Sequence, residues 1–362
     1  MQKAPACGSF LSEREELTML RWNNDYNRIA HEAIIRAMGE CSEESYAGYG
    51  TDTLCDLAKE RIRAHLGGAD VDIHFLVGGT QTNFVAVSTA LRSFESVLCA
   101  ESGHIACHET GAVENTGHKV HTLKATDGKL TAEQIAHEAE LFRTSGIQEH
   151  ITCPRMVFIS YPTEFGTLYT KEELLAIRKV CDEYGLYLYL DGARLGYGLG
   201  SEKCDVTLAD LAQLCDAFYI GGTKCGAMMG EALILKHPVF RTCFRSYMKQ
   251  NGAMLAKGFL LGLQFAVLFE NGLYFDITRK AVAQSMRLRE GFEKKGLPLF
   301  VESFTNQQFV IFTQEQMDTL AKKHIFEYQE ALPDGRHCLR FCTGWSTRDE
   351  DVEELLKDIA AL

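Results

Sequence analysis

The chain has 362 residues, of which 46% are hydrophobic, and a formal net charge of −12 at pH 7. This length exceeds the size at which a single hydrophobic core usually stops growing, so we expect two domains. The acidic residues are scattered and no block rich in lysine and arginine occurs, which argues against nucleic acid and anionic membranes as partners. The 13 cysteines include no Cys-x-x-Cys pair, and the first 20 residues lack the apolar run of a signal peptide. We therefore expect reduced thiols and a cytoplasmic protein.

Six short apolar runs recur between residues 71 and 235, with helical segments between them. They lie at 73–77, 97–100, 156–160, 186–190, 217–220 and 232–235. Strands that are apolar at consecutive positions are buried on both faces, which favours a mostly parallel sheet. Segments 80–92 and 171–184 have the apolar spacing of amphipathic helices that would cover such a sheet. The pattern therefore predicts a large α/β domain.

The pattern changes after residue 235 to helical stretches at 237–249, 252–269 and 275–295. Two strands at 309–312 and 338–341 follow, and then a helix from about residue 347 to the end. These features predict a smaller α+β domain, completed by part of the first 50 residues. We place the limits at 1–45 for an N-terminal segment that joins the small domain, 46–250 for the large domain, and 251–362 for linker helices and the small domain.

The residues that follow each apolar run are candidates for a site, because ligands of an open α/β sheet bind beyond the carboxyl ends of the strands. The first run is followed by Gly78-Gly79-Thr80-Gln81, where the glycines permit close approach of the backbone and Thr80 can cap the next helix. Backbone N–H groups and the helix dipole at that point favour a phosphate. A capped turn without a ligand has the same sequence pattern.

Two further strand ends carry an acid and a lysine. Asp191 follows the run 186–190, where a buried carboxylate needs a partner; an ion pair with Arg194 or a simple turn would also explain it. Lys224 follows the run 217–220 between glycines. Such a lysine is commonly exposed, but a desolvated amine there suits Schiff-base chemistry. A phosphate cradle, a buried acid and a glycine-flanked lysine together meet the requirements of pyridoxal 5′-phosphate.

Seven segments spread over nearly the whole chain match one family. They are Asn24-Asp25-Tyr26, Gly48-Tyr49-Gly50, 78–83, His104, 190–194, 222–224 and Arg340. In this order and spacing the chain resembles the low-specificity L-threonine aldolases, in the β-eliminating lyase group of fold type I pyridoxal-phosphate enzymes. The resemblance implies the fold of aspartate aminotransferase, with a large, mostly parallel-sheet domain and a smaller α+β C-terminal domain.

The resemblance also implies which residues surround the reactive part of the cofactor. By this likeness Lys224 binds the aldehyde of the cofactor, Asp191 pairs with the pyridine nitrogen, and His104 stacks on the face of the ring. Three more histidines follow His104 by residue 121, but their spacing matches no metal site. We therefore expect pyridoxal phosphate as the cofactor and no metal.

The same resemblance implies contacts at the edges of the cofactor and to the substrate. Gly79 and Thr80 would hold the phosphate, and Arg194 would lie on the side of the ring that carries the phenolic oxygen. Arg340 matches the arginine that grips the carboxylate of the substrate through two parallel hydrogen bonds. The expected partner is a small-molecule substrate, an amino acid.

Two positions depart from the pattern of the family. Leu255 stands where many members carry an arginine that reaches the phosphate of the neighbouring subunit, and Lys257 is a nearby candidate for that charge. Asn24 stands where the family usually has serine. Because enzymes of this fold build their sites at a subunit interface, we expect a homodimer or homotetramer. Tyr49 and segment 252–257 would reach across, with Asn24 and Tyr49 as candidate substrate contacts.

The function implied by the resemblance is cleavage of a β-hydroxy-α-amino acid by a carbon–carbon lyase. L-Threonine or L-allo-threonine would give glycine and an aldehyde. His104, His150 or an ordered water could take the proton of the β-hydroxyl group, and His104 is the preferred base.

Other functions remain open at this point. β-Elimination, racemisation and transamination would use the same Lys224 and Asp191. A protein that binds the cofactor without turnover fits the departures at Leu255 and Asn24. A dinucleotide-dependent oxidoreductase is disfavoured, because the glycines after the first strand do not form a Gly-x-Gly-x-x-Gly turn.

Overall fold

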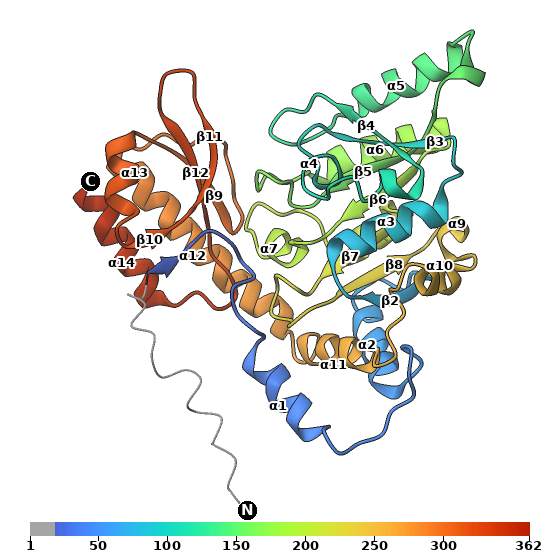
Figure 1. Ribbon diagram of the computed structural model, residues 1–362, viewed down its shortest axis with the longest axis horizontal. Helices are drawn as coiled ribbons and strands as arrows, with labels where there is room; N and C mark the ends of the chain where they lie inside the picture. Colours follow the sequence, from blue (N-terminus) through green and yellow to red (C-terminus); the bar gives the residue numbers. More distant parts are fainter. Residues whose placement is uncertain (1–18) are drawn as a thin grey trace, which may run out of the picture.

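The computed structural model describes residues 19–362, and a seven-stranded sheet lies at the centre of its larger part (Figure 1). The strand order is β2-β8-β7-β6-β5-β3-β4, and β8 alone runs antiparallel to both of its neighbours. The strands are β2 (Asp72–Leu76), β3 (Glu95–Ala100), β4 (Lys119–Leu123), β5 (Cys153–Ser160), β6 (Tyr187–Asp191), β7 (Ala217–Gly221) and β8 (Glu231–Leu235). The prediction of a mostly parallel sheet flanked by helices is confirmed.

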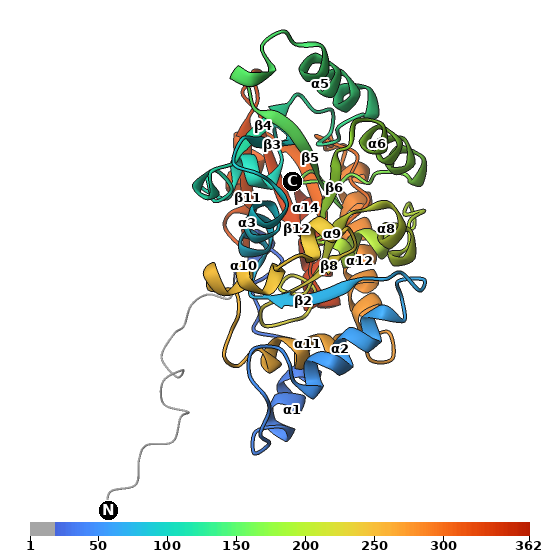
Figure 2. The same cartoon turned by 90° about the vertical axis from the view of Figure 1, so that its right-hand side faces the viewer.

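Helices cover both faces of this sheet. Successive strand residues point to opposite sides, so strands that are apolar at consecutive positions have an apolar surface to bury on each face. Leu98 packs in one apolar cluster, with residues of α5 and α6, and its neighbours Val97 and Cys99 pack in a second cluster, with residues of α3 and α10. Figure 2 shows α3 and α10 on one side of the strands and α6 and α8 on the other. These helices are α3 (Gly79–Ala90), α5 (Ala132–Thr144), α6 (Lys171–Tyr184), α8 (Leu208–Leu214) and α10 (Phe244–Gln250).

Several of these helices begin at capping boxes that the sequence encodes locally. In α5 the Thr131 side chain accepts from the Gln134 backbone, and the Gln134 side chain accepts in return from the Thr131 backbone. Thr170 and Glu173 form the same pair at the start of α6. Such reciprocal bonds satisfy N–H groups that have no partner inside a helix, so they define where each helix begins.

The C-terminal part contains a second, antiparallel sheet with the order β11-β12-β9. Its strands are β9 (Gln307–Phe312), β11 (Glu327–Ala331) and β12 (His337–Cys342), and the helices beside them are α12 (Leu273–Lys295), α13 (Gln314–Leu320) and α14 (Asp349–Ala361). Trp22 follows β1 (Leu20–Arg21), which pairs with β10 (His324–Ile325), and is 2% exposed in the apolar core of this part. A segment from the N-terminus therefore completes the core of the C-terminal part.

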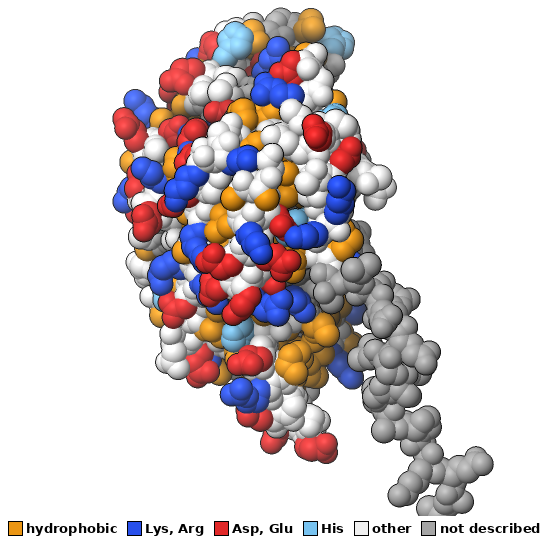
Figure 3. Space-filling view, turned by 90° about the vertical axis from the view of Figure 1, so that its left-hand side faces the viewer, with side chains coloured by type: hydrophobic (Ala, Val, Ile, Leu, Met, Phe, Trp, Pro, Cys, Tyr) orange, Lys and Arg blue, Asp and Glu red, His pale blue; other side chains and the backbone are white. Residues whose placement is uncertain are grey.

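The surface of this C-terminal side carries acidic and basic side chains mixed together (Figure 3). Arg287 pairs with Glu353 between α12 and α14, and Lys323 lies 2.8 Å from Asp358. Exposed pairs of this kind contribute little to stability, at most about 1 kcal/mol each.

The remaining helices include the main corrections to the predicted elements. They are α1 (Glu32–Glu40), α2 (Thr53–Arg63), α4 (His104–Cys107), α7 (Leu195–Leu199), α9 (Pro238–Arg241) and α11 (Phe259–Leu268), with short 3₁₀ turns at Glu114–Thr116 and Gln148–His150. The helix predicted at 237–249 is two helices, because Cys243 adopts a left-handed conformation with φ of 57°. The helix predicted at 252–269 begins only at Phe259. Strand β4 was not predicted, since it lies at the sheet edge and is half exposed, so it lacks a continuous apolar run.

No single helix within residues 19–362 is long and apolar enough to cross a membrane. Helices α11 and α12 reach that length and composition only as a pair, and they meet at an angle of 67°. Most of α11 is buried against other parts of the fold.

Candidate active site

Asp191 is the last residue of β6, and its buried carboxylate is satisfied by three donors. Oδ1 accepts from the Tyr219 hydroxyl at 2.6 Å and from the Ala193 backbone at 2.9 Å, and Oδ2 accepts from Asn83 Nδ2 at 2.9 Å. Glycine is required directly after it, because a Cβ on Gly192 would lie 1.8 Å from the Tyr219 carbonyl oxygen. The acid is therefore held rigidly at the carboxyl end of a central strand, as the strand pattern predicted.

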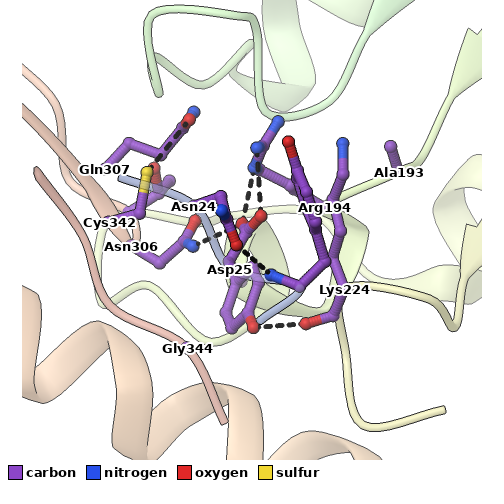
Figure 4. Close-up of polar contacts among 12 residues, drawn as sticks. Asn24, Asp25, Ala193, Arg194, Lys224, Asn306, Gln307, Cys342 and Gly344 are labelled. Carbon is purple, nitrogen blue, oxygen red and sulfur yellow. Dashed lines mark hydrogen bonds and ion pairs between the residues drawn. The ribbon is translucent and has the colours of Figure 1, made fainter. Parts of the chain in front are cut away.

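Arg194 does not pair with Asp191, so the ion pair considered from the sequence is wrong. Its guanidinium instead binds Asp25, with Nε 2.7 Å from Oδ2 and Nη2 3.1 Å from Oδ1 (Figure 4). Asn306 Nδ2 donates to the same carboxylate at 2.9 Å. Although burial raises the pKa of Asp25, the nearby charges of Arg194 and Lys224 hold that pKa below its usual value. Asp25 lies in a matched segment but was not predicted as a site residue, and only the fold brings it to Arg194.

Lys224 lies in the loop between β7 and β8 and is partly buried, so the exposed lysine considered from the sequence is wrong. The loop is tied down because the backbone N–H groups of Gly222 and Thr223 both donate to the Gly230 carbonyl, at 3.0 and 3.1 Å. Burial and the neighbouring Arg194 lower the pKa of the Lys224 amine. A larger share of neutral amine at a given pH makes this lysine a better nucleophile.

A buried acid that the sequence did not reveal lies behind this loop. Glu231 opens β8, is 3% exposed, and accepts from the Gly222 backbone at 2.9 Å. Burial raises the pKa of Glu231 to about 7, and Lys224 acts in the opposite direction.

The first turn of α3 presents free backbone donors, but not in the way predicted. Gly78, and not Thr80, is the N-cap residue, and no side chain caps the helix. The first N–H groups of a helix lack partners inside it, so those of Gly79 and Thr80 are available to an anion. A Cβ on Gly79 would lie 3.0 Å from the Tyr219 hydroxyl, which explains the glycine there.

His104 opens the short helix α4 and is held by two acids that were not predicted as site residues. Its Nδ1 lies 2.8 Å from Glu109 Oε1, and its backbone N–H donates to Glu164 Oε1 at 2.9 Å. Glu164 also accepts from the Ser160 hydroxyl at 2.6 Å, and burial raises the pKa of Glu164. The only feature of the sequence that could have pointed to Glu109 is its position five residues after His104.

Of the three other histidines of this segment, His108 lies beside His104, with ring centroids 5.6 Å apart, whereas His118 and His121 have other partners. His118 is buried against Thr116 and the Leu91 carbonyl, and His121 lies 3.7 Å from Glu138. Among residues 19–362, no group of three or more histidine, cysteine or acidic side chains is arranged to hold a metal ion.

Arg340 lies on β12 and keeps part of its guanidinium free. Nη2 donates to the Asn23 carbonyl at 3.2 Å, whereas the buried Nε has no partner among the residues that the structure describes. A buried N–H donor without an acceptor is costly, so it suits a ligand carboxylate. Asn24 follows Asn23 in the chain, and its Oδ1 accepts from the Tyr26 backbone N–H at 3.1 Å.

Tyr49 lies elsewhere in this chain, beside the segment 252–258. It is 46% exposed, its backbone N–H donates to the Ala256 carbonyl at 3.1 Å, and the Lys249 amine lies 4.7 Å from its ring centre. A pocket of about 300 Å³ here is lined by Leu255 and by the cations Lys59 and Arg245, whereas Lys257 is exposed and outside the lining. Among the described residues of one chain, no hydrogen bond or ion pair joins Tyr49 to Lys224.

His150, a candidate base, also lies away from this group of residues. It ends a 3₁₀ turn just before β5 begins at Cys153, which places it at the amino end of the strand. Asp191 and Lys224 lie at the opposite, carboxyl ends of their strands. Within one chain, the sequence-based suggestion of His150 as a base is therefore wrong.

The residues that the fold does bring together fit pyridoxal phosphate. An amine with a lowered pKa, a buried carboxylate on a neighbouring strand and unpaired N–H groups at the start of α3 match its aldehyde, pyridine nitrogen and phosphate. The unpartnered Nε of Arg340 adds a donor for the carboxylate of an amino acid.

Known proteins share both the sequence pattern and the fold. The model of the β-eliminating lyase family matches residues 30–319. A low specificity L-threonine aldolase of Pseudomonas sp. (strain NCIMB 10558) is 29% identical over 343 residues, covering 94% of this chain and 96% of the relative. The threonine aldolase of Leishmania major is 42% identical, with a TM-score of 0.91, and the match covers 94% of this chain and 99% of that one.

A more distant structure defines the fold class. Aspartate aminotransferase of Thermus thermophilus superposes with a TM-score of 0.70 over 99% of this chain and 97% of that one, at 16% identity, which shows the fold alone. The predicted fold type I architecture and the predicted resemblance are both confirmed. The chain belongs to the β-eliminating lyase family.

Proposed function

We propose that this protein is a pyridoxal-phosphate-dependent carbon–carbon lyase that cleaves L-threonine, L-allo-threonine or a related β-hydroxy-α-amino acid to glycine and an aldehyde. The observation that carries the proposal is the partly buried Lys224, whose amine has a lowered pKa, beside the rigidly held Asp191. The relatives named as threonine aldolases support this reaction over β-elimination, racemisation or transamination.

Each part of the cofactor would be held by a residue with matching chemistry. Lys224 would bind the aldehyde, Asp191 would keep a proton on the pyridine nitrogen, and the N–H groups of Gly79 and Thr80 would donate to the phosphate. Arg194, fixed by Asp25, would flank the ring at its phenolic oxygen. When bound, the cofactor supplies a sink for the electrons of the broken bond.

The substrate would be oriented by Arg340 and deprotonated by His104. Arg340 would bind the substrate carboxylate through its free Nε and a terminal nitrogen, which would orient the substrate for cleavage of its Cα–Cβ bond. A carboxylate only accepts hydrogen bonds, so Nδ1 of His104 carries the hydrogen toward Glu109. Nε2 would then be free to take the proton of the β-hydroxyl group. Asn24 and Tyr49 are further candidate contacts to the substrate.

The protein would act as a homodimer or homotetramer with shared active sites. Exposed apolar side chains gather around α1, α2 and α11, which lie side by side at the bottom of Figure 1. They are Ile29, Ile35, Leu57 and Leu260, with exposures of 36% to 72%. Large exposed apolar patches commonly mark protein interfaces. Light scattering coupled to size-exclusion chromatography would test this state, and a monomer at micromolar concentration would contradict it.

A cytoplasmic location and the predicted domain limits complete the proposal. Twelve of the 13 cysteines lie in the described part of the chain and all twelve are free thiols, which suits a reducing compartment. We propose the limits 1–45, 46–250 and 251–362, of which residues 1–18 lie outside the described part. Limited proteolysis would test these limits by cleaving near residues 45 and 250.

The first experiment is a product assay on the purified protein loaded with pyridoxal phosphate. We expect the visible absorbance of the lysine-bound cofactor, and equal amounts of glycine and acetaldehyde from L-threonine or L-allo-threonine. Cofactor absorbance without these products would overturn the aldolase assignment and direct the search to another amino-acid reaction. No cofactor binding at all would overturn the entire proposal.

A further inference from the structure

A chain of hydrogen bonds joins His104 to Asp191 through Glu109, which accepts the Nδ1 hydrogen of His104 in the proposed mechanism, and through Asn83, which that mechanism does not use. Glu109 Oε1 lies 2.8 Å from His104 Nδ1 and accepts from Asn83 Nδ2 at 2.8 Å. The same Nδ2 donates to Asp191 Oδ2 at 2.9 Å. The four side chains come from α3, the segment of α4 and the end of β6, which are distant in sequence.

The side-chain amide of Asn83 bridges the two acids of this network, Glu109 and Asp191. Its side chain is fully buried, and its amide nitrogen has two hydrogens, one for each carboxylate. Its Oδ1 accepts from the Tyr189 hydroxyl at 3.1 Å, which determines the orientation of the amide. An aspartate here would face two carboxylates without a hydrogen to share, and an apolar residue would leave both unsatisfied.

Glu109 uses one oxygen for both of its bonds. Oε1 accepts from His104 and from Asn83, whereas Oε2 is buried and has no partner among the described residues. The residue as a whole is 6% exposed. A glutamine with its carbonyl oxygen at the position of Oε1 can therefore accept both bonds, whereas alanine can accept neither.

We propose that Asn83 and Glu109 are positioning residues of the lyase, which hold the imidazole of His104 and the carboxylate of Asp191 as one hydrogen-bonded unit. The inference rests on the proposed function, in which His104 contacts the ring face and Asp191 the pyridine nitrogen. The two groups would then be aligned against the same ring by a buried connection through the protein. Loss of either link would leave His104 free to rotate.

The test compares Glu109→Gln, Glu109→Ala, Asn83→Ala and the double alanine variant. Since a catalytic group misplaced by about 1 Å can lose up to about 100-fold in rate, we expect each single alanine variant to lower kcat about 10- to 100-fold. Glu109→Gln should retain kcat within about threefold, because both hydrogen bonds can persist. The double variant should be no slower than about the slower single variant, since residues that act as one unit are not additive.

A second readout does not depend on turnover. Titration of each apoprotein with pyridoxal phosphate should show a weaker affinity and a shifted absorbance maximum for Asn83→Ala, because Asp191 loses one of its three donors. Thr89→Val is the matched control, since Thr89 is a buried polar residue of the same helix that bonds only to the Val85 carbonyl. It should leave affinity, spectrum and kcat unchanged.

Two outcomes would overturn the inference. One is full additivity of the two alanine variants, and the other is an equal loss in Glu109→Gln and Glu109→Ala. Both are distinct from a failure of the proposed function, which would appear in the unaltered protein as a lack of glycine and aldehyde.

Discussion

Two regions of the molecule differ in how far their polar and aromatic side chains find partners within one chain. At the strand ends around Asp191 and Lys224, buried polar groups find partners inside the chain, and the arrangement is rigid. Around Tyr49 and segment 252–258, a pocket is lined by cations and its aromatic residue is half exposed. Most buried polar groups are satisfied by the fold itself, whereas exposed groups can find their partners in a ligand or a second copy. In the proposed function, the first region would hold the chemistry and the second would receive a partner subunit.

The largest effect is expected at the centre of the first region. Lys224→Ala should abolish the visible absorbance of the lysine-bound cofactor and lower kcat at least about 1000-fold, because the proposed function gives this amine the bond to the cofactor. Lys179→Ala, an exposed lysine on α6, is the control and should behave like the unaltered protein. Persistence of the absorbance in Lys224→Ala would refute the central assignment.

The next effect is expected at Arg340, on the side of the first region that faces the C-terminal part. Arg340→Lys keeps the charge but loses the planar fork, so we expect kcat/KM for threonine to fall about 100-fold while the cofactor spectrum is unchanged. Arg336→Ala removes a half-buried arginine from the turn before β12, where it pairs only with Asp334 among the described residues, and serves as the control. If Arg340→Lys had unaltered kcat/KM, the carboxylate contact would be wrong.

The ion pair of Asp25 and Arg194 tests how the N-terminal segment supports the first region. Asp25→Asn should lower the free energy of unfolding by about 3 to 5 kcal/mol near neutral pH, because it leaves a buried guanidinium without its counter-charge. The pKa of Asp25 is below its model-compound value of 3.8, so this stability is present above that pH and is lost as the pH falls through the folded-state pKa. Urea unfolding of the apoprotein measures it. In a cycle with Arg194→Leu, the double variant should be more stable than the sum of the single losses predicts.

Glu231 provides a smaller, pH-dependent test of the first region. Its folded-state pKa of about 7 exceeds the usual glutamate value of 4.5, so the native state binds more protons between these values and stability falls as the pH rises through this window. Glu231→Gln should therefore stabilise the apoprotein by up to about 3 kcal/mol at about pH 8, and by much less at about pH 5. An equal gain at both pH values would show that the carboxyl group does not titrate in this window.

The smallest change in stability is expected in the second region, and there an activity assay tests whether Tyr49 serves a partner subunit. Tyr49→Ala should cost about 0.5 to 1 kcal/mol, for the lost contact with Lys249. If Tyr49 serves the neighbouring subunit, mixing the inactive Tyr49→Ala and Lys224→Ala proteins after dissociation should restore about a quarter of the activity, because half of the dimers are mixed and each has one intact site. No recovery after mixing would place Tyr49 outside the shared site.

The positions of the main strands and of the chemistry after them could be predicted because they depend on local patterns. The predicted runs 156–160 and 217–220 lie within β5 and β7, the run 186–190 begins one residue before β6, and Asp191 and Lys224 follow where expected. Edge strands such as β4 could not be predicted in this way, because a half-exposed strand needs no continuous apolar run.

The sequence by itself determined the fold class, the cofactor chemistry and the residues at the strand ends, since burial on both faces demands apolar runs and the ligand must lie where those runs stop. Only the tertiary structure decided which partners these residues have. Arg194 binds Asp25, which lies 169 positions away in the sequence. Asn83 bridges Glu109 and Asp191, and these three residues come from separate parts of the fold. Such pairings depend on how packed elements meet in space, and no local spacing in the sequence encodes that geometry.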